Sequence, residues 1–387
     1  MDEKKVPKLR FEGFVQDWEQ RKLGEVADEF KSGYSIKAEN IFDKGEYPVY
    51  GGNGIRGFTD TFNHDGEFAL IGRQGALSGN MNFSTNKAYF TEHAIAVRAN
   101  NMNDTRFLYF LLCKLQLGRW VTQSAQPGLA VGTLVEIRIQ VPGKAKEQQK
   151  VGNFFKKLDD TIALHQDKLN KLKQLKKGFL QVLFANETTI PKIRFANFTE
   201  EWEQRKLSDV ASIVGGGTPS TSNPEYWEGD IDWYAPAEIG DQIYVNKSLK
   251  TITELGQQKS SAKILPIGTV LFTSRAGIGN TAILAKEGTT NQGFQSIVPH
   301  ENKLDSYFIF SRTHELKRYG EVTGAGSTFA EVSGKQLAKM PILIPCIDEQ
   351  RKIGAFFEQL DNTIALHQNK LKILKQLKKS FLQKMFI

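Results

Sequence analysis

The chain has 387 residues, of which 40% are hydrophobic and 11% aromatic, enough for two or three domains with proper cores. The charged N-terminus lacks the apolar core of a signal peptide, and no run approaches the roughly 18 apolar residues of a membrane span. Cys113 and Cys346 are the only cysteines, too few for a disulfide framework or a zinc ribbon. We therefore expect a globular, cytoplasmic protein.

The formal net charge of +8 is concentrated in two segments. Residues 144–184 carry ten Lys and Arg against four Asp and Glu, residues 347–387 carry eight against four, and the rest of the chain has a charge of −2. Cations in the C-terminal half of a helix suit the helix dipole, and a solvated helix face explains much of this excess. The basic charge alone is therefore weak evidence for a nucleic-acid partner.

The chain opens with a segment that recurs in its second half. Lys8–Leu23 and Lys192–Leu207 share about 10 of 16 positions. Each begins a lobe, at about 8–143 and 192–345, in which we expect mixed α/β structure with irregular, mainly antiparallel sheets. The expected strands are Tyr47–Tyr50, Phe68–Ile71, Ala94–Val97, Ile137–Val141, Thr269–Thr273, Gln295–Val298 and Met340–Ile344, and the expected short helices are Asp104–Gly118 and Asp305–Arg318.

A long segment follows each lobe, and its two copies are nearly the same. Glu147–Phe184 and Glu349–Phe386 share about 26 of 38 positions, contain no proline and are rich in helix-forming residues, so each predicts one long helix. Apolar residues at 3-4-3-4 spacing predict the seam of a coiled coil between the two copies. The seam residues are Phe155, Leu158, Ile162, Leu169 and Leu172 in the first copy and Phe357, Leu360, Ile364, Leu371 and Leu374 in the second.

Two details of the seam lead to further expectations. His165 and His367 occupy equivalent seam positions, and we favour hydrogen-bonded seam residues over metal ligands. Leu175 comes only three residues after Leu172, an irregularity of the stammer kind, and the second copy is expected to keep the pattern through Leu377.

The second lobe is longer than the first. The opening segments recur at an offset of 184 and the long helices at 202, so about 18 extra residues lie between Leu207 and the second helix. We place them in Gly215–Asp241, whose prolines, small residues and two tryptophans predict an ordered loop.

Motifs for catalysis are weak or missing. Gly52-Asn-Gly54-Ile-Arg-Gly57 fits a dinucleotide fingerprint, but no helix start follows it, and we interpret it as a turn. Asn223-Pro-Glu-Tyr226 is similar to the Asn-Pro-Pro-Tyr/Phe loop of adenine N6-methyltransferases, but no methyl-donor site accompanies it. The sequence has no Gly-Lys-Ser/Thr phosphate loop and no His-Glu-x-x-His zinc motif. We assign no catalytic residue and no metal ligand.

Binding chemistry is more evident. Ala69–Asn80 aligns with Leu271–Ala282 as a strand and a glycine-rich turn, which matches Arg73 with Arg275. Arg, Asn and Gln are the side chains that read base edges, and polar-aromatic loops offer phosphate and groove contacts. The alternative is that both arginines are internal loop braces. The candidate DNA-binding residues are Tyr34, Lys37, Asn53, Arg56, Arg73, Gln74, Asn80, Thr218, Ser220, Tyr226, Trp233, Arg275 and Asn280.

The complete pattern resembles a known family. A Trp-x-x-x-x-Leu opening, a variable lobe, a strand ending in proline and a Glu-Gln helix occur twice, at Trp18–Leu23 with Glu147–Gln181 and at Trp202–Leu207 with Glu349–Gln383. This arrangement resembles the specificity subunit of type I restriction-modification systems. The resemblance implies an α/β (α+β) fold with two mixed, β-rich target recognition domains, separated by two long antiparallel helices that form a coiled coil, in a pseudo-twofold internal repeat.

The resemblance also implies a division of the chain and of the work. Target recognition domains at 1–143 and 187–345 would each read half of a bipartite double-stranded DNA site, and spacer helices at 144–186 and 346–387 would set the gap. Two methyltransferase subunits would bring S-adenosylmethionine, and two restriction/translocase subunits would bring ATP and Mg²⁺, so we expect no cofactor in this chain.

Two other functions stay open at this stage. A self-contained DNA enzyme would need a methyl-donor or metal site, which the sequence does not offer. A scaffold would use its lobes to bind proteins, and exchanging a lobe would change the partner and leave the methylated sequence unchanged.

Overall fold

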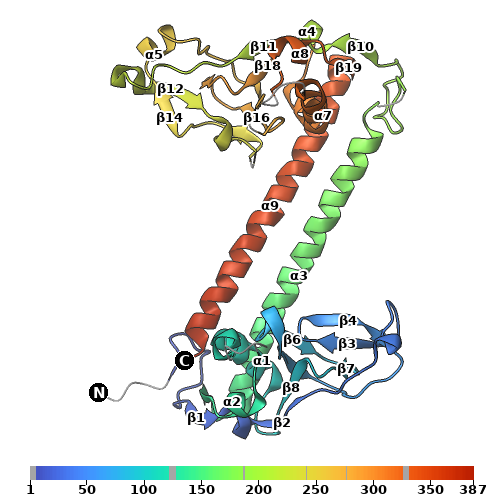
Figure 1. Ribbon diagram of the computed structural model, residues 1–387, viewed down its shortest axis with the longest axis vertical. Helices are drawn as coiled ribbons and strands as arrows, with labels where there is room; N and C mark the ends of the chain where they lie inside the picture. The colour runs from blue at the N-terminus through green and yellow to red at the C-terminus, as the bar shows by residue number, and fades with distance from the viewer. Residues whose placement is uncertain (1–5, 122–127, 186–187, 241, 276, 326–330) are drawn as a thin grey trace. The chain divides into compact units, whose positions relative to one another are not determined.

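A computed structural model describes residues 6–121, 128–185, 188–240, 242–275, 277–325 and 331–387 (Figure 1). The chain forms two compact units, which we describe separately. Unit 1 comprises Met1–Lys168 and His367–Ile387, and unit 2 comprises Leu169–Leu366. Each unit therefore contains one lobe and a part of each long helix, α3 (Ala145–Val182) and α9 (Ile347–Met385).

The described residues of unit 1 form three small sheets and two short α-helices beside the long-helix segments. The strands of the main sheet are antiparallel, in the order β2 (Ala27–Ser32), β8 (Ala94–Ala99), β5 (Phe68–Gly72), β6 (Met81–Ser84). The second sheet has the order β4 (Gly54–Thr59), β3 (Tyr47–Gly51), β7 (Tyr89–Phe90), with β3 and β7 parallel, and β1 (Glu19–Lys22) pairs with β9 (Arg138–Val141). The helices are α1 (Thr105–Leu115) and α2 (Val131–Val135), with 3-10 turns at Leu23–Val26, Ala38–Asn40, Gly75–Leu77 and Leu117–Trp120.

Unit 2 repeats this plan with additions. Its main sheet has the order β11 (Ala211–Gly215), β18 (Gln295–Pro299), β15 (Val270–Phe272), β16 (Thr281–Leu284), β13 (Tyr244–Val245). The second sheet has the order β14 (Lys250–Ile252), β12 (Trp227–Tyr234), β17 (Thr289–Thr290), and β10 (Glu203–Lys206) pairs with β19 (Pro341–Ile344). The short helices are α4 (Leu207–Val210), α5 (Glu254–Gln258), α6 (Ser306–Ser311), α7 (Thr313–Gly324) and α8 (Gly334–Ala338), with 3-10 turns at Pro224–Tyr226 and Pro236–Glu238.

The two lobes share one topology, which confirms the mixed, mainly antiparallel fold expected from the sequence. All seven expected strands are present within one or two residues of their expected ends. The expected helix Asp305–Arg318 is instead two helices, α6 and α7, which meet at Arg312. The buried guanidinium of Arg312 donates to the carbonyl of Leu343, which fixes this break against the neighbouring strand.

The extra residues of the second lobe do not lie where the sequence placed them. Val49 of β3 pairs with Tyr89, and Trp233 of β12 pairs with Thr289 in the same way. Val49 and Trp233 are offset by 184, like the opening segments, so the second lobe has gained no residues before this point. Tyr50 and Ala69 are 19 positions apart, whereas the equivalent Tyr234 and Val270 are 36 apart. The placement in Gly215–Asp241 was therefore wrong for most of its length, because the extra residues lie between Tyr234 and Val270. β14 occupies the place of β4, whereas β13 and α5 have no equivalent in the described residues of the first lobe.

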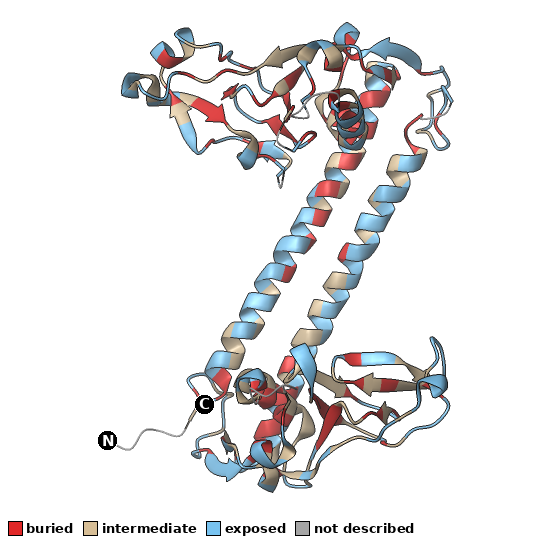
Figure 2. Ribbon diagram, in the orientation of Figure 1, coloured by how far each residue is buried: buried red, intermediate tan, exposed pale blue. Residues whose placement is uncertain are grey.

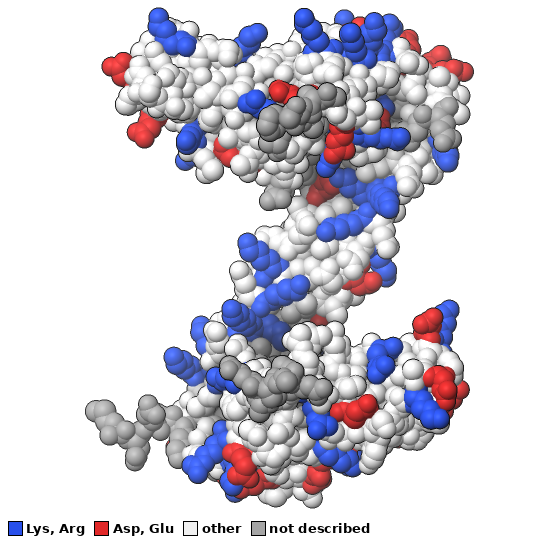
Figure 3. All heavy atoms as spheres, in the orientation of Figure 1, with Lys and Arg blue, Asp and Glu red and all other residues white. Residues whose placement is uncertain are grey.

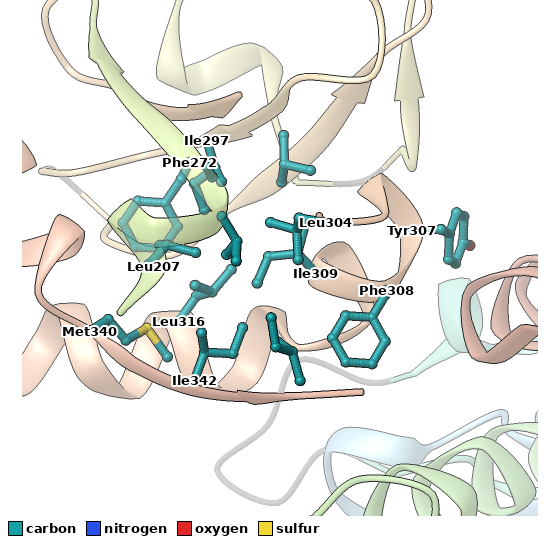
Figure 4. Packing of buried hydrophobic residues seen from close by; sticks show 14 of the residues in the cluster. Leu207, Phe272, Ile297, Leu304, Tyr307, Phe308, Ile309, Leu316, Met340 and Ile342 are labelled. Carbon is teal, nitrogen blue, oxygen red and sulfur yellow. The ribbon is translucent and has the colours of Figure 1, made fainter. Parts of the chain in front are cut away.

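Both long helices contribute to the core of each lobe. In unit 1, Phe155 of α3 and Phe386, just after α9, lie with ring centroids 5.8 Å apart in the cluster that contains Trp18. In unit 2, Phe184, just after α3, and Phe357 of α9 lie 5.7 Å apart in the equivalent cluster (Figure 4). Figure 2 shows buried residues in each lobe and where α3 and α9 begin. Each core is therefore closed by one helix start and one helix end.

The repeated Glu-Gln pair explains how each helix is fixed to its lobe. Glu147 accepts two hydrogen bonds from Arg10, at 2.7 and 2.8 Å, and Glu349 accepts two from Arg194, both at 2.7 Å. The glutamate side chains are 3% and 0% exposed. Such bidentate pairs are among the stronger polar contacts, and here they join the opening segment to the first turn of the helix.

The adjacent glutamine ties the same turn to the lobe. Gln148 Nε2 donates to the carbonyl of Pro142 at 2.9 Å, and its Oε1 accepts from the backbone N–H of Asp104, the N-cap of α1, at 3.0 Å. Gln350 makes the same contacts with Pro345 and Asp305. The glutamine thus joins the end of the last strand, the start of a short helix and the start of the long helix.

The seam residues follow the predicted pattern closely. Phe155, Leu169, Phe357, Ile364 and Leu371 are buried, and the other five predicted seam residues are half-buried. Leu175 and Leu377 are 48% and 43% exposed, so the pattern that we extended through Leu377 ends at Leu374.

Equivalent polar contacts join the two helices within each unit and show that their segments run antiparallel. In unit 1, Lys378 pairs with Asp159 at 2.6 Å, and in unit 2 the equivalent Lys176 pairs with Asp361, also at 2.6 Å. His165 and His367, both in unit 1, lie with their Nδ1 atoms 3.1 Å apart, which confirms the expected hydrogen-bonded pair. One ring must donate and the other accept, so the pair cannot survive with both rings protonated.

We predict that acid weakens this contact. Burial, followed by the nearby charges of Lys370, His367 and Lys168, lowers the pKa of His165 from its ordinary value of 6.5. The unfolded chain then binds the proton more readily, so the stabilisation is complete above about pH 6.5 and is lost as the pH falls below it. Thermal unfolding measured from pH 8 to pH 5 should show this loss, and a His165→Gln variant should show less of it. An identical pH dependence in both proteins would contradict the assignment.

We also predict that Arg194 stabilises unit 2. Replacing Arg194 with Met leaves the fully buried Glu349 carboxylate without its partner, which should cost about 3–5 kcal/mol of unfolding free energy. Urea unfolding measures the effect. The matched control is Arg205→Met, since Arg205 pairs with Glu203 on the surface, and its loss should change stability by less than about 1 kcal/mol. Equal effects of both substitutions would refute this role of the buried pair.

Candidate nucleic-acid interface

The first lobe gathers several candidate residues around one hollow. The turn between β3 and β4 supplies Asn53, the strand β4 supplies Arg56, and the turn after β5 supplies Gln74. Together with His93 and Leu77 they line a concave surface of about 430 Å³. Asn53, Arg56 and Gln74 are exposed, so their donors and acceptors face solvent.

The turn after β5 holds its side chains on a tightly hydrogen-bonded backbone. Gly72 N donates to the carbonyl of Asn80 at 2.8 Å, and Gly79 N donates back to the carbonyl of Gly72 at 2.8 Å. Gly79 has a φ of +84°, and a Cβ atom there would lie 2.4 Å from the backbone N of Gly118, so only glycine fits. Asn80 Nδ2 also donates to Asn53 Oδ1 at 2.8 Å, which links the two turns.

The second lobe builds the same turn from a different sequence. Thr273 N donates to the carbonyl of Asn280 at 3.0 Å, and Gly279 N donates to the carbonyl of Thr273 at 2.9 Å. Gly279 again has a positive φ, of +94°, and is closely approached by Lys317. The two turns are therefore structural equivalents, with Asn80 matched to Asn280.

The hydrogen bonds correct the sequence alignment of the arginines. Arg73 N donates to the carbonyl of His93 and its own carbonyl accepts from Leu129, and Ser274 makes the same two bonds, with Gly293 and Val332. In each lobe the next residue forms an isolated β-bridge. Gln74 bridges to Gly128 in the first lobe, and Arg275 bridges to Glu331 in the second. Arg73 is thus equivalent to Ser274, and Arg275 is equivalent to Gln74. The sequence alignment used the offset of 202 found for the long helices, whereas the backbone of the two lobes is offset by 201 at these residues.

The candidates on the first-lobe loop before β3 are accessible. Tyr34 is 55% exposed and its backbone N–H donates to the carbonyl of Phe90. Lys37 lines a second hollow, of about 450 Å³, with Asn40 and Tyr89, and lies 3.4 Å from the exposed Glu39.

The second-lobe loop contains one candidate that must be corrected. Trp233 is only 7% exposed, packs with Ile252 and Ala262, and donates its Nε1–H to the carbonyl of Gly217 at 2.8 Å. It is an internal anchor, because it follows the alternation of β12 into the core. Thr218 and Tyr226 are half-buried, and Thr218 donates to Gln292, while Ser220 is exposed.

The arginines are not braced by carboxylates. Within the described ranges, Arg56, Arg73 and Arg275 take part in no ion pair, which favours the interpretation of an open contact over that of an internal brace. Figure 3 shows that Lys and Arg gather instead on the visible face of the long helices, while the lobes carry mixed charge. The lobes are therefore suited to reading polar groups and less to strong attraction of phosphate.

The structure adds residues that sequence reasoning missed. His93 and Leu77 line the first hollow, and Ile55 beside them is 54% exposed. Apolar side chains next to amides suit the methyl group of thymine. No motif marks these residues, because they come from β4, from the turn after β5 and from the residue before β8, which are far apart in the sequence.

Catalytic chemistry has little support in the described part of the chain. No group of three or more His, Cys, Asp or Glu there is arranged to hold a metal ion. Burial raises the pKa of the Cys113 thiol to about 11, so it is not an activated nucleophile. Among these residues, no helix has the length and apolar character that crossing a bilayer requires.

The comparisons with known proteins identify the family. The model of the "type I restriction modification DNA specificity domain" matches residues 15–174 and again residues 199–376. The chain belongs to this family, and each half carries one copy of the domain.

Individual relatives agree with this assignment. The chain is 34% identical over 209 residues to the MjaIX specificity subunit of Methanocaldococcus jannaschii, covering 53% of this chain and 48% of the relative. It is 40% identical over 138 residues to the EcoprrI specificity subunit of Escherichia coli, covering 35% and 34%. These matches span about half or less of each relative's length. A putative MjaX specificity subunit matches over 95% of this chain and 92% of its own length, at 22% identity.

A solved structure supports the fold. The crystal structure of a type I restriction-modification S subunit from M. genitalium superposes with a TM-score of 0.73, covering 99% of both chains at 16% identity.

Proposed function

We propose that this chain is the non-catalytic DNA specificity subunit of a type I restriction-modification complex, in which each lobe reads one half of a bipartite site. The observation that carries this proposal is the contrast between the halves. The helices and their anchoring contacts are nearly identical, whereas equivalent turns present Gln74 in one lobe and Arg275 in the other. One structural task is thus combined with two different ligand surfaces.

The chemistry of these turns suits base recognition. An arginine reads guanine through O6 and N7, and a glutamine reads adenine through N6 and N7. Both side chains follow a buried strand and sit on a turn fixed by backbone bonds, so their direction is set before any ligand binds. The lobes would therefore read different bases through equivalent positions.

The long helices are assigned the spacing and docking role. Within each unit the seam joins the lobe core, through Phe155 in unit 1 and Phe357 in unit 2, which suits a spacer. Half-sites one turn of B-DNA apart are separated by roughly 34 Å. The exposed lysines of the helices provide a basic surface for a partner subunit or for DNA phosphate.

Catalysis is assigned to partner subunits in the cytoplasm. Two methyltransferase subunits would bind S-adenosylmethionine and methylate adenine, and two restriction/translocase subunits would bind ATP and Mg²⁺. The relatives are named specificity subunits, which supports this division.

Exchanging a lobe tests the proposal. The first lobe of a related subunit, grafted between the opening segment and α3, should change one half of the methylated sequence and leave the other half intact. The scaffold alternative predicts a change of partner with both half-sites unchanged. Methylation by the purified chain alone would instead support the self-contained enzyme.

We predict that Arg275 determines one base pair. Arg275→Ala should lose about 1–3 kcal/mol of discrimination and relax the sequence requirement at one position of one half-site. Methylation rates of oligonucleotides that carry each base at every position measure this change. The control is Arg205→Ala, on the exposed strand β10 of the same lobe, which should behave as wild type.

A uniform loss would point to a different role. If Arg275→Ala weakens methylation of all sequences equally and lowers the salt dependence, the side chain contacts phosphate and does not read a base.

A further inference from the structure

The second lobe covers one edge of its main sheet with its own insertion. β13 pairs in parallel with β16, with Tyr244 opposite Ile283 and Val245 opposite Leu284. Ile283 N donates to the carbonyl of Ile243 at 2.7 Å, and Ala285 N donates to that of Val245 at 2.9 Å. The outward N–H groups of β16 are thereby satisfied.

The same short strand is anchored by its side chains. Val245 is 4% exposed in a core cluster, and Ile243 packs on the main core of unit 2. Tyr244 donates its hydroxyl to Glu358 of α9 at 2.5 Å, and its ring centroid lies 6.3 Å from that of Tyr307 in α6. The short strand β13 therefore fits between the sheet edge at β16, the short helix α6 and the long helix α9.

The first lobe has the same edge without the covering strand. In the described residues of unit 1, β6 is the last strand of the main sheet. The pairing of Ala69 with Phe83, which matches that of Val270 with Ile283, makes Phe83 equivalent to Ile283 and Thr85 equivalent to Ala285. The N–H groups of Phe83 and Thr85 are therefore the ones that an added strand would meet.

A groove lies at this edge, and the residues that line it occupy positions equivalent to those around Tyr244. It has a volume of about 370 Å³ and is lined by residues that include Phe83, Thr85, Arg106, Tyr109, Lys156 and Asp159. Phe83 and Tyr109 are half-buried, with ring centroids 5.2 Å apart. Arg106 takes the place of Tyr307, because each is the second residue after the N-cap of its helix, Asp104 or Asp305. Lys156 takes the place of Glu358, because the two residues occupy the same position in the repeated long helices.

The charge of the groove differs in a way that specifies its occupant. Lys156 replaces the carboxylate that accepts the tyrosine hydroxyl in the second lobe. Arg106 has a buried Nε–H without a hydrogen-bond partner, although its other nitrogens contact Glu67 and Asn153. Lys156 pairs with the exposed Asp160 at 2.5 Å, and Asp159, which also lines the groove, pairs with Lys378. An exposed pair contributes little, so Lys156 can exchange Asp160 for another carboxylate. The unused donor of Arg106 therefore favours one acceptor side chain where the second lobe has Tyr244.

We propose that this groove binds an extended segment of a partner protein, which adds to β6 as a parallel fifth strand and places one carboxylate at Lys156 and Arg106. Backbone hydrogen bonds would supply affinity, and the two cations would supply selectivity. The partner is a subunit of the complex, so the inference rests on the proposed function.

The first test removes one backbone donor. Thr85→Pro deletes an N–H at an exposed edge, where proline is tolerated, and Thr85→Val is the matched control that keeps it. With the full chain and the methyltransferase subunit of the same system, Thr85→Pro should raise the dissociation constant at least tenfold and Thr85→Val should leave it unchanged. Equal binding by both variants would overturn the inference.

Two further measurements keep the test decisive if Thr85→Pro does not fold. Hydrogen exchange on the wild-type chain should show new protection of the Phe83 and Thr85 amides in the complex. Lys156→Glu, which restores the charge found in the second lobe, should weaken binding by a similar factor. Unchanged exchange and unchanged binding would overturn the inference while sequence-specific methylation persists. A wild-type chain that neither binds the methyltransferase subunit nor directs methylation would overturn the proposed function itself.

Discussion

The buried pair between a helix glutamate and an arginine of the opening segment is the contact on which the rest of the structure depends. Glu147 with Arg10, and Glu349 with Arg194, join the first turn of each long helix to the lobe before it. Because both carboxylates are inaccessible to water, neither can lose its partner without a large cost. The contact therefore fixes the direction in which each lobe is held on its helix, and it explains why these segments are repeated so faithfully.

The parts of each lobe outside the long helices and these anchoring pairs differ between the two halves of the chain. The second lobe inserts residues after Tyr234, and part of the insertion seals the edge of its main sheet. In the part of the first lobe that the structure describes, no strand pairs with the same edge. The recognition turns vary in the same way, since one fixed backbone carries Gln74 in one lobe and Arg275 in the other. A shared frame with exchangeable surfaces suits a reader of two unlike half-sites.

The sequence predicted the frame well because its signals are local and repeated. Seam leucines such as Leu169 and Leu371 follow from helical spacing, and the histidine pair follows from its position in the seam. The exact equivalence of residues in the two lobes was not predictable. In the sequence Arg73 aligns with Arg275, whereas the backbone hydrogen bonds match Arg275 with Gln74. Trp233 was misassigned for a related reason, since an aromatic in a polar loop has no sequence mark that distinguishes an anchor from a contact.

The most direct test of the central claim is the genome-wide pattern of adenine methylation with and without this gene, with the methyltransferase subunit present in both strains. We expect deletion to remove methylation from one split sequence, whose two halves are separated by a fixed gap, and to leave other sites unchanged. An identical methylation pattern in the two strains, with the protein expressed, would contradict the account, because a specificity subunit must determine where its complex acts.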